Sequence, residues 1–561
     1  MRKSRLARPR LAPLPFSVLA EGASRVRAWH ILTVSAEAQA SSPTSGQLRR
    51  RPRAAALAYG WRLALVLFAA GVAISAFTIL RRIDPFDEGV ALEAARRVMQ
   101  GQVPHRDFLW AYGPGDPYLM AGLFKLFGVS LLDWRILRVI SDAASALAVF
   151  VLARRLAGTK LALLAWLAAA CAFAQPTSAN PAAEAFAFGL WALVVVTGEE
   201  EPGTWRLVGA AVLTAACAAW RPDFGGYAAL ACLTALALRP GPRGRRLALY
   251  LGATVAITAA IYAPLAIAVG PHDLYEAIVV HSTQQGSAWR LPFPLHFRGG
   301  FPLWPPGRAH DALVFYVPLL LVIGLTLSAA LSLLGRWELP RRWGALLVLG
   351  ACGLLYMLSR TDDLHTAPLL AAVVVLLAAA AAAAANIDRR IAALPLVVLL
   401  LLTLYGVSNR LSALVRPPHL VTVHVAVADG VKDTPANAQA LERVVPLVRR
   451  LVPPGGYLYV APRRSDLVTL NNVTLYVLTE RGDPVDVDLS TQSRPGSQRR
   501  IVSVLARVRP RAVVRWTDPL SSRPEPNSRG RSSGSHILDR WLAQHYRLLE
   551  RYGFYDVMVP R

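Results

Sequence analysis

The chain has 561 residues, of which 54% are hydrophobic and only 17% are charged, and its formal net charge is +26 at pH 7. A soluble protein of this length carries more charge and fewer long apolar runs, so these values exclude an ordinary soluble globular protein. Much of the positive excess lies in the N-terminal tail and in short loops between apolar runs. There it acts as a topology signal and not as a nucleic-acid surface.

The first 415 residues divide into a polar tail and a series of apolar segments. Residues 1–53 are rich in Arg, Ser, Pro and Ala, which predicts a disordered basic cytosolic tail. Residues 54–415 hold about eleven segments near the roughly 20-residue length that crosses a hydrocarbon core, which predicts an α-helical polytopic membrane protein. The predicted spans are 57–80, 132–153, 160–175, 181–197, 205–220, 224–238, 246–269, 312–334, 343–358, 367–385 and 391–411.

The loops between these spans alternate in charge. Short loops such as "ARRLAGTK" and "RPGPRGRR" are rich in Arg and Lys, whereas the loop at 81–131 and the loop "SRTDDLHT" belong to the other set. Basic short loops face the cytoplasm, so the sequence predicts a cytoplasmic N-terminus in a plasma or inner membrane. An odd number of spans then places the C-terminal portion outside, on the same face as the polar loops.

After Arg416 the composition changes to that of a small α/β domain. The runs "GGYLYVAP", "VTLYVLTE" and "RAVVRW" predict short strands, since β-branched and aromatic residues favour strands. The runs "AQALERVVPLVRRL", "QRRIVSVLARV" and "SHILDRWLAQHYRLLERYG" predict amphipathic helices. We therefore expect an extracytoplasmic α/β domain over residues 416–561, with "SSRPEPNSRGRSSGS" as a polar loop within it.

The first outer loop begins with "RRIDPFDEG", which contains the carboxylates Asp84, Asp87 and Glu88. One interpretation is a helix start, because Asp84 suits an N-cap and acids in the first turn favour the positive end of the helix dipole. The other interpretation is an active site. A sugar transfer needs a general base for the acceptor hydroxyl, and a carboxylate at the membrane surface can meet both a lipid-borne donor and a water-borne acceptor.

The rest of this loop carries a resemblance. The order "DEG…GQxPxRDF…YGPGxPYLxAxLFKLFGxSLxxxR" resembles the first extracytoplasmic loop of the GT-C superfamily, polytopic glycosyltransferases that use polyprenyl-phosphate-linked sugars. It is similar in particular to the family-39-like group of protein mannosyltransferases, aminoarabinose transferases and lipopolysaccharide galacturonosyl transferases. The resemblance covers this loop in detail and the rest of the chain by its layout. Gly89 departs from the residues that usually follow the acids, so acceptor identity is not carried over.

The resemblance implies roles for several residues. It makes Asp87 the catalytic carboxylate and Glu88 its companion, and the loop adds Arg106 and Asp107 as candidate substrate ligands. Some members of the superfamily need a divalent cation and others do not, so a metal is left open. The implied partners are a polyprenyl-phosphate-linked sugar, membrane lipids and a glycan, lipid or protein acceptor of the cell envelope.

Two further outer loops offer polar side chains. In "LSRTDDLHTAPLL", Arg360 and His365 are candidate ligands of the donor phosphate, because a guanidinium fork matches phosphate oxygens; a plain polar loop with Arg paired to Asp is the alternative. The loop at 270–311 mixes aromatic residues with prolines, which is typical of passive anchoring among lipid headgroups. Its alternative role is a groove wall, with His281 touching donor or acceptor. The aromatic residues are Trp289, Phe293, Phe297, Phe301 and Trp304.

Charged residues near span ends are expected to be structural. Arg138 and Asp142 stand one helical turn apart and can pair, and Arg221 and Asp223 lie in one tight turn.

The sequence therefore predicts an integral-membrane glycosyltransferase that acts on the outer face. A transporter or lipid flippase is the first alternative, although such proteins place ionisable residues near the bilayer midplane, often in repeated halves. A non-catalytic envelope scaffold and a lipid-linked oligosaccharide ligase or polymerase are the others.

Overall fold

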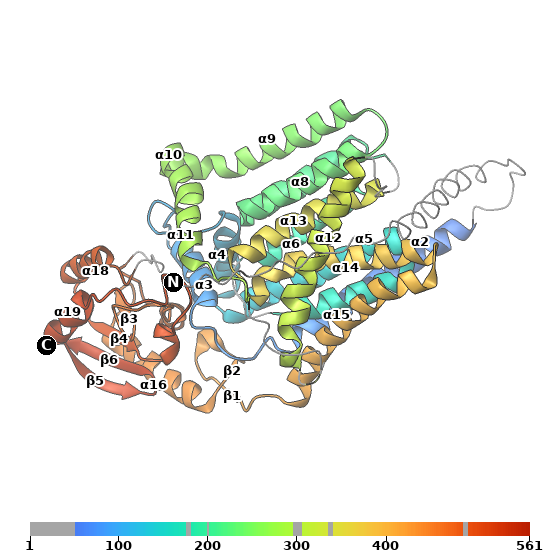
Figure 1. The fold of residues 1–561 in the computed structure, drawn as a ribbon. Coiled ribbons are helices and arrows are strands. Elements are labelled where there is room, and N and C mark those ends of the chain that lie inside the picture. Colours follow the sequence, from blue (N-terminus) through green and yellow to red (C-terminus); the bar gives the residue numbers. More distant parts are fainter. Residues whose placement is uncertain are drawn as a thin grey trace, which may run out of the picture. The chain divides into compact units, whose positions relative to one another are not determined.

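The computed structural model describes residues 51–175, 181–198, 201–295, 304, 306–334, 340–485 and 492–561. The predicted tail at 1–53 falls almost wholly on residues 1–50, outside the described residues. Residues Ala64–Arg561 form one compact unit. Within it, a series of apolar helices is followed by a small domain that contains a sheet (Figure 1).

Each predicted span coincides with a helix in the described part of the chain. The helices are α2 (Arg51–Ala76), α5 (Leu131–Phe173), α6 (Ala182–Val196), α7 (Thr204–Trp220), α8 (Pro222–Leu238), α9 (Arg243–Val269), α12 (Val317–Leu333), α13 (Gly344–Ser359), α14 (Asp363–Ala385) and α15 (Arg389–Val415). Helix α5 holds two predicted spans, since Gly158 interrupts it with φ 76° and ψ 174°, a conformation that glycine adopts without steric penalty.

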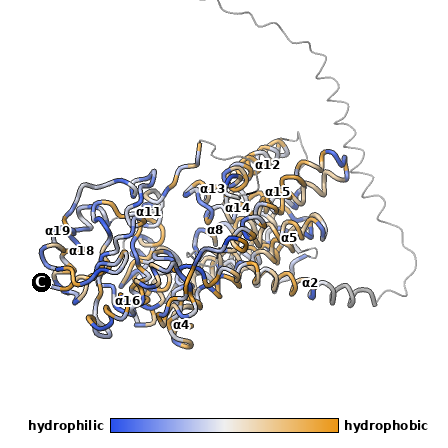
Figure 2. The backbone as a smooth tube through the Cα atoms, turned by 90° about the horizontal axis from the view of Figure 1, so that it is seen from below, coloured by the Kyte–Doolittle hydropathy of each residue, from blue (hydrophilic) through white to orange (hydrophobic). Residues whose placement is uncertain are grey.

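Six of the described helices are long and apolar enough to cross a membrane, and four shorter apolar helices accompany them. The long ones are Leu131–Phe173, Arg243–Val269, Asp311–Ser332, Arg341–Ser359, Asp363–Ala385 and Arg389–Val415. Figure 2 shows the contrast in hydropathy: α5, α12, α13, α14 and α15 are mainly hydrophobic, whereas α16, α18 and α19 of the C-terminal segment mix both kinds of residue. The protein is thus a membrane protein with a polar C-terminal domain.

Basic connections meet at one end of the helices. Arg155 donates to the carbonyl oxygen of Val194 at 2.6 Å, and Arg239 donates to the carbonyl oxygen of Val196 at 3.1 Å. These contacts bring together the α5 interruption, the α6–α7 connection and the α8–α9 connection. All three belong to the loop set predicted to face the cytoplasm.

Shorter elements form the polar loops. The loop at 81–131, predicted from its charge to be the first outer loop, contains α3 (Asp87–Met99) and α4 (Gly115–Phe127). The segment after α9 contains α10 (Pro271–Tyr275), the π-helical η2 (Glu276–His281) and α11 (Ser282–Trp289). The remaining short turns are the 3₁₀ segments η3 (Pro306–Arg308) and η5 (Arg341–Trp343) and the π-helical η4 (Asp311–Tyr316).

The C-terminal segment is an α/β domain, as expected. It consists of β1 (Val421–Thr422), η6 (Ala426–Ala428), β2 (Lys432–Asp433), α16 (Pro435–Leu451), β3 (Leu458–Ala461), α17 (Thr474–Thr479), α18 (Pro495–Val508), β4 (Ala512–Trp516), η7 (Pro519–Ser522), α19 (Ile537–His545), β5 (Tyr546–Tyr552) and β6 (Tyr555–Pro560). Strands β1 and β2 pair with each other. The main sheet has the order β3-β4-β6-β5, in which β3 and β4 are parallel and the other pairs are antiparallel.

Two local predictions in this domain are wrong. The run "VTLYVLTE" contains helix α17 instead of a strand, and every residue of Thr474–Thr479 is buried. A short, fully buried apolar run has no periodicity that separates helix from strand. The predicted helix at 535–553 ends at His545, and β5 follows it, because Tyr546–Tyr552 pairs with β6 around Gly553.

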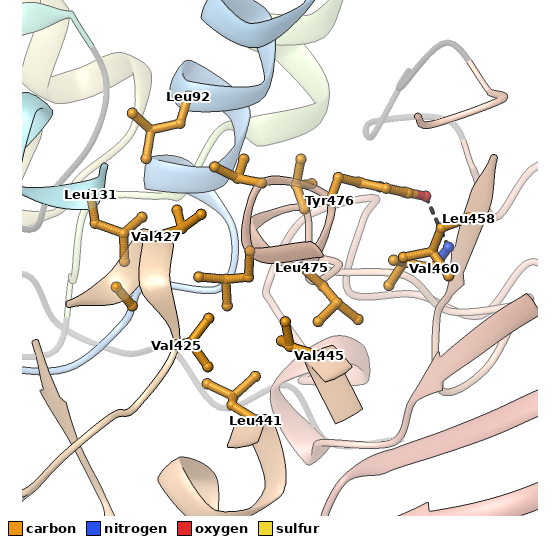
Figure 3. Packing of buried hydrophobic residues seen from close by; sticks show 14 of the residues in the cluster. Leu92, Leu131, Val425, Val427, Leu441, Val445, Leu458, Val460, Leu475 and Tyr476 are labelled. Atoms are coloured by element: carbon orange, nitrogen blue, oxygen red, sulfur yellow. Dashed lines mark hydrogen bonds between the residues drawn. The ribbon is translucent and has the colours of Figure 1, made fainter. Parts of the chain in front are cut away.

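The core of the C-terminal domain continues into the first outer loop. One buried cluster joins Leu92 of α3 and Leu131 at the start of α5 to residues of the C-terminal segment, among them Val425 and Leu475 (Figure 3). Tyr476 also lies in it, and its hydroxyl accepts a hydrogen bond from the backbone N of Val460 at 2.9 Å. This shared core holds the start of α3 in a fixed place.

Candidate active site

The start of α3 is organised by Asp84. Its Oδ1 accepts hydrogen bonds from the backbone N of Phe86 at 2.9 Å and of Glu88 at 3.3 Å. The N-cap residue of α3 is Phe86. Asp84 lies two residues before it and still accepts a hydrogen bond from an amide of the first helical turn. Burial raises the pKa of Asp84 against the opposing effect of these amides. The expectation of Asp84 as the N-cap residue is therefore wrong, although its carboxylate does bind amides at the helix start.

Glu88 forms a fully buried ion pair with Arg135 at the start of α5. Its two carboxylate oxygens accept from Nε of Arg135 at 2.6 Å and from Nη2 at 2.8 Å, and both side chains are 0% exposed. Arg135 also donates to the carbonyl oxygens of Ile79 and Arg82. Glu88 thus fastens α3 to the end of the first span, and its carboxylate has no face open to a substrate.

Asp87 points the other way. Its side chain is exposed, although protein surrounds it at longer range. This desolvation, together with the negative charge of Asp84, raises the pKa of Asp87 to about 8. The charges of Arg360 and Arg529 act in the opposite sense. An accessible carboxylate with a pKa near neutrality is suited to take up a proton.

Arg360 brings the "SRTDDLHT" loop to this carboxylate. Its Nε donates to Oδ2 of Asp362 at 2.9 Å, and its Nη1 donates to the carbonyl oxygen of Trp289 at 2.7 Å. Nη2 lies 3.3 Å from Oε1 of Glu525 in the C-terminal domain. The predicted meeting of the "DEG" and "SRTDDLHT" loops is therefore present, and a segment of the C-terminal domain joins them.

His365 lies one turn into α14 and is oriented by Asp362. The Oδ1 of Asp362 accepts both from the backbone N of His365 at 3.0 Å and from its Nδ1 at 2.6 Å, and the ring packs on Tyr356 with centroids 4.5 Å apart. Burial acts to raise the pKa of Asp362, but the hydrogen bonds from His365 outweigh it and the pKa is lowered. Asp362 is consequently a carboxylate that fixes both Arg360 and His365.

Trp289, at the end of α11, forms an aromatic wall of the site. It stacks on Phe86 with ring centroids 5.8 Å apart. The guanidinium carbon of Arg360 lies 5.6 Å from its centroid, and that of Arg529 lies 3.1 Å away. For this aromatic residue the groove-wall alternative fits better than the headgroup anchor that the sequence favoured. Phe297 and Phe301 lie outside the described residues.

At the "YGPG" motif, the loop at 81–131 packs closely against the turn between α7 and α8. Gly113 donates its backbone N to the carbonyl oxygen of Trp220 at 3.1 Å, and a Cβ at Gly113 or Gly115 would overlap this turn. The preceding Tyr112 packs over the guanidinium of Arg221 at 5.0 Å. Close approach of the Ala219 backbone explains Gly113, and the indole ring of Trp220 explains Gly115.

Arg221 and Asp223 form the ion pair expected from the sequence. The Nη2 of Arg221 lies 2.6 Å from Oδ2 of Asp223, and its Nη1 donates to the hydroxyl of Tyr356 at 2.9 Å. Arg138 is likewise a charged neighbour of Asp142 inside the helices.

The remaining predicted ligands lie elsewhere on the outer loops. Arg106 and Asp107 pair with each other at an exposed turn, with Nη2 of Arg106 2.8 Å from Oδ2 of Asp107. His281 closes η2, and the next residue, Ser282, lies with its Oγ 3.4 Å from the carbonyl oxygen of Ala111 in the first loop. The roles of Arg106, Asp107 and His281 as ligands stay predictions.

The polar face of α3 packs against the C-terminal domain. If α3 were an amphipathic helix at the membrane surface, Glu93, Arg96 and Arg97 would face water. They are instead buried: Nη2 of Arg96 donates to the carbonyl oxygen of Arg481 at 2.7 Å, and Nη2 of Arg97 lies 3.2 Å from Oδ2 of Asp483. An amphipathic pattern shows only that one face is polar, and here protein groups replace water as its partners.

Two residues of this site were missed from the sequence as functional candidates: Arg135 as the anchor of Glu88, and Arg529; Trp289 entered only through the groove-wall alternative. Arg529 lies in the polar run "SSRPEPNSRGRSSGS", where its composition is that of an ordinary loop. Only tertiary packing places it beside Asp87.

Metal ligation finds no support in the described residues. In those ranges, no group of three or more His, Cys, Asp or Glu side chains is placed to share an ion. The divalent cation left open by the resemblance has no ligands assigned to it here. The geometry therefore offers one accessible carboxylate, two guanidinium groups and an aromatic wall, which together can accept a proton and hold an anion.

No protein-family model matches this sequence, and no curated protein matches it. Two crystal structures of ArnT from Cupriavidus metallidurans are similar to the chain, each with a TM-score of 0.51 and 15% identity. The structure bound to undecaprenyl phosphate matches over 90% of this chain and 97% of ArnT, and the apo structure over 90% and 98%. At this identity the likeness shows the fold alone, and it confirms the polytopic architecture expected from the sequence.

Proposed function

We propose that this chain, which has the fold of the GT-C superfamily of membrane glycosyltransferases, moves a sugar from a polyprenyl-phosphate donor to a hydroxyl of a cell-envelope acceptor. The observation that carries the proposal is the convergence of Asp87 with Arg360, a base beside a cation, where the "DEG" and "SRTDDLHT" loops meet. ArnT, which shares the fold, has been crystallised with undecaprenyl phosphate, a lipid of the proposed donor class.

In the proposed reaction, Asp87 accepts the proton of the acceptor hydroxyl while that oxygen attacks the anomeric carbon. The bond from this carbon to the phosphate oxygen breaks, and its electron pair leaves with the lipid phosphate, so the sugar carbon is inverted. Arg360 offers a planar guanidinium to the charge that grows on the leaving phosphate. Asp362 holds Arg360 and His365 in register, which makes it a positioning residue.

We assign Glu88 a supporting role within this mechanism. Its carboxylate is saturated by Arg135 and buried, so it contributes by fixing the first turn of α3 and with it the direction of Asp87. Glu88 is therefore the structural member of this acidic pair, because it binds Arg135, and Asp87 is left as the reactive member.

The remaining assignments follow from the loop charges and stay proposals. Residues 54–415 would form the transferase domain, with the first loop at 81–131 and the domain at 416–561 outside the plasma or inner membrane and the N-terminus in the cytoplasm. The α/β domain would meet the acceptor glycan, lipid or protein, since it borders the site through Glu525.

Reconstitution tests this function. The full-length protein in proteoliposomes is given a polyprenyl-phosphate sugar labelled in the sugar, with an envelope extract as acceptor. We expect label to appear in envelope material and free polyprenyl phosphate to accumulate. Movement of the intact lipid between leaflets without transfer of label would contradict the proposal and favour a flippase.

A further inference from the structure

Arg529 is buried, and its side chain has no hydrogen-bonding partner among the residues that the structure describes. It is 2% exposed, and none of its Nε, Nη1 and Nη2 atoms has an acceptor within the described part of the chain. Buried polar groups are nearly always hydrogen-bonded, and a buried cation without an acceptor is destabilising. Burial lowers the pKa of Arg529 to about 9, which leaves the guanidinium charged near neutral pH.

The loop that carries Arg529 is held in place by specific contacts. The Oδ1 of Asn527 accepts from the backbone N of Arg529 at 3.0 Å and of Gly530 at 3.2 Å, and Gly530 has no room for a Cβ beside Glu525. Further along, the backbone N of Ser533 donates to the carbonyl oxygen of Asp466 at 2.8 Å. The guanidinium of Arg529 is thus held in position by an ordered loop.

The surroundings of Arg529 point to an anion. It shares the ring of Trp289 with Arg360, and its charged neighbours are Glu525, Arg360 and Asp87. Two guanidinium groups that repel each other are expected to be held on one aromatic wall when a ligand with several acceptor oxygens joins them. Phosphate has this property, and arginine binds its oxygens with two parallel N–H groups.

We propose that Arg529, contributed by the C-terminal domain, is a second arginine for the phosphate of the donor lipid, and that it binds non-bridging oxygens together with Arg360. This inference rests on the proposed function and extends it, because it makes the α/β domain part of the donor site. The α/β domain would then bind the donor as well as the acceptor, because it supplies one of the two arginines that bind the phosphate.

Binding of defined lipids to the full-length protein in nanodiscs tests this assignment. The probes are a polyprenyl monophosphate, the matching uncharged polyprenol and inorganic phosphate. For Arg529→Gln we expect a roughly tenfold to hundredfold weaker Kd for the polyprenyl monophosphate, as for loss of a hydrogen bond to a charged group, and an unchanged Kd for the polyprenol. Arg529→Lys keeps the charge without the fork and should recover part of the affinity.

The matched control is Arg531→Gln, which removes the same charge from an exposed position in the same loop and should bind like the wild type. An Arg529→Gln protein that binds the polyprenyl monophosphate within twofold of the wild type, while Arg360→Gln does not, would overturn the inference and leave the proposed function standing. A wild type that binds the polyprenol or inorganic phosphate as tightly as the polyprenyl monophosphate would instead contradict the proposed donor.

A merely structural role for Arg529 is separated by thermal unfolding. Because its guanidinium lacks acceptors, Arg529→Gln should leave the Tm of the lipid-free protein unchanged or higher and should reduce the rise in Tm caused by the polyprenyl monophosphate. A lower Tm of the lipid-free variant with the lipid-induced rise intact would identify a packing residue and overturn the assignment.

Discussion

Gly89 and Thr474 meet backbone to backbone, and this contact joins the first outer loop to the C-terminal domain. A Cβ at Gly89 would lie 2.7 Å from Cα of Thr474 and would overlap its backbone N. That N donates to the carbonyl oxygen of Pro85 at 3.1 Å. The glycine that follows the acidic pair therefore lets α17 approach the turn that carries Asp87.

Gly89→Ala should destabilise the protein by about 2–3 kcal/mol, because the added methyl group meets backbone that cannot move aside. The free energy of unfolding, from denaturant titration in detergent, measures this. Gly122→Ala on α4 is the control, since a Cβ there meets nothing within 4 Å; it should be neutral or slightly stabilising. Equal effects of the two substitutions would show that the approach at Gly89 is not tight.

Glu88→Gln should cost about 3–5 kcal/mol of stability, since it leaves Arg135 charged and buried without its carboxylate. Glu480→Gln removes one acid from an exposed pair with Arg449 and should cost less than about 1 kcal/mol. The same titration compares them. A loss at Glu88 no larger than that at Glu480 would disprove the anchoring role.

The pH dependence of transfer should report Asp87. A base works when deprotonated, and burial and Asp84 raise the pKa of Asp87 to about 8, so kcat/KM should rise with pH through about 8. Arg360 lowers this pKa, so Arg360→Gln should shift the midpoint to higher pH, whereas Arg106→Gln at the exposed turn should not. A midpoint that stays in place in Arg360→Gln would separate Arg360 from the base.

Trp289→Ala should weaken binding of polyprenyl monophosphate by roughly tenfold, because both arginines lose the ring that holds them. Trp289→Phe should retain most of the affinity. Trp304→Ala, at an exposed residue outside this site, is the control and should bind normally. If Trp304→Ala weakened binding as much as Trp289→Ala, a general interfacial effect would explain both.

Much of the membrane architecture was predictable because hydropathy depends on local composition. The spans, the break at Gly158 between two of them, and the α/β character of residues after Arg416 all follow from runs of neighbouring residues. Asp87 and Arg360 were also expected in one site, since the predicted topology puts their loops on one face.

What the sequence could not reveal depends on long-range packing. The exposed-looking polar face of α3 carries Arg97, whose partner Asp483 lies almost four hundred residues away. The same holds for Arg529 and Trp289, whose contact joins a polar loop to an aromatic segment. A local sequence pattern predicts whether a surface is polar or apolar, but the residues that pack against that surface are known only from the folded structure.

The most direct test of the account is transfer by Asp87→Asn in proteoliposomes that contain a polyprenyl-phosphate sugar. Loss of a general base should lower the rate by about 10²–10⁴-fold with donor affinity retained, while Glu480→Gln, in the exposed pair with Arg449, should stay within about twofold of the wild type. Transfer by Asp87→Asn at the wild-type rate would contradict the account, because no carboxylate at this position would then take part in the reaction.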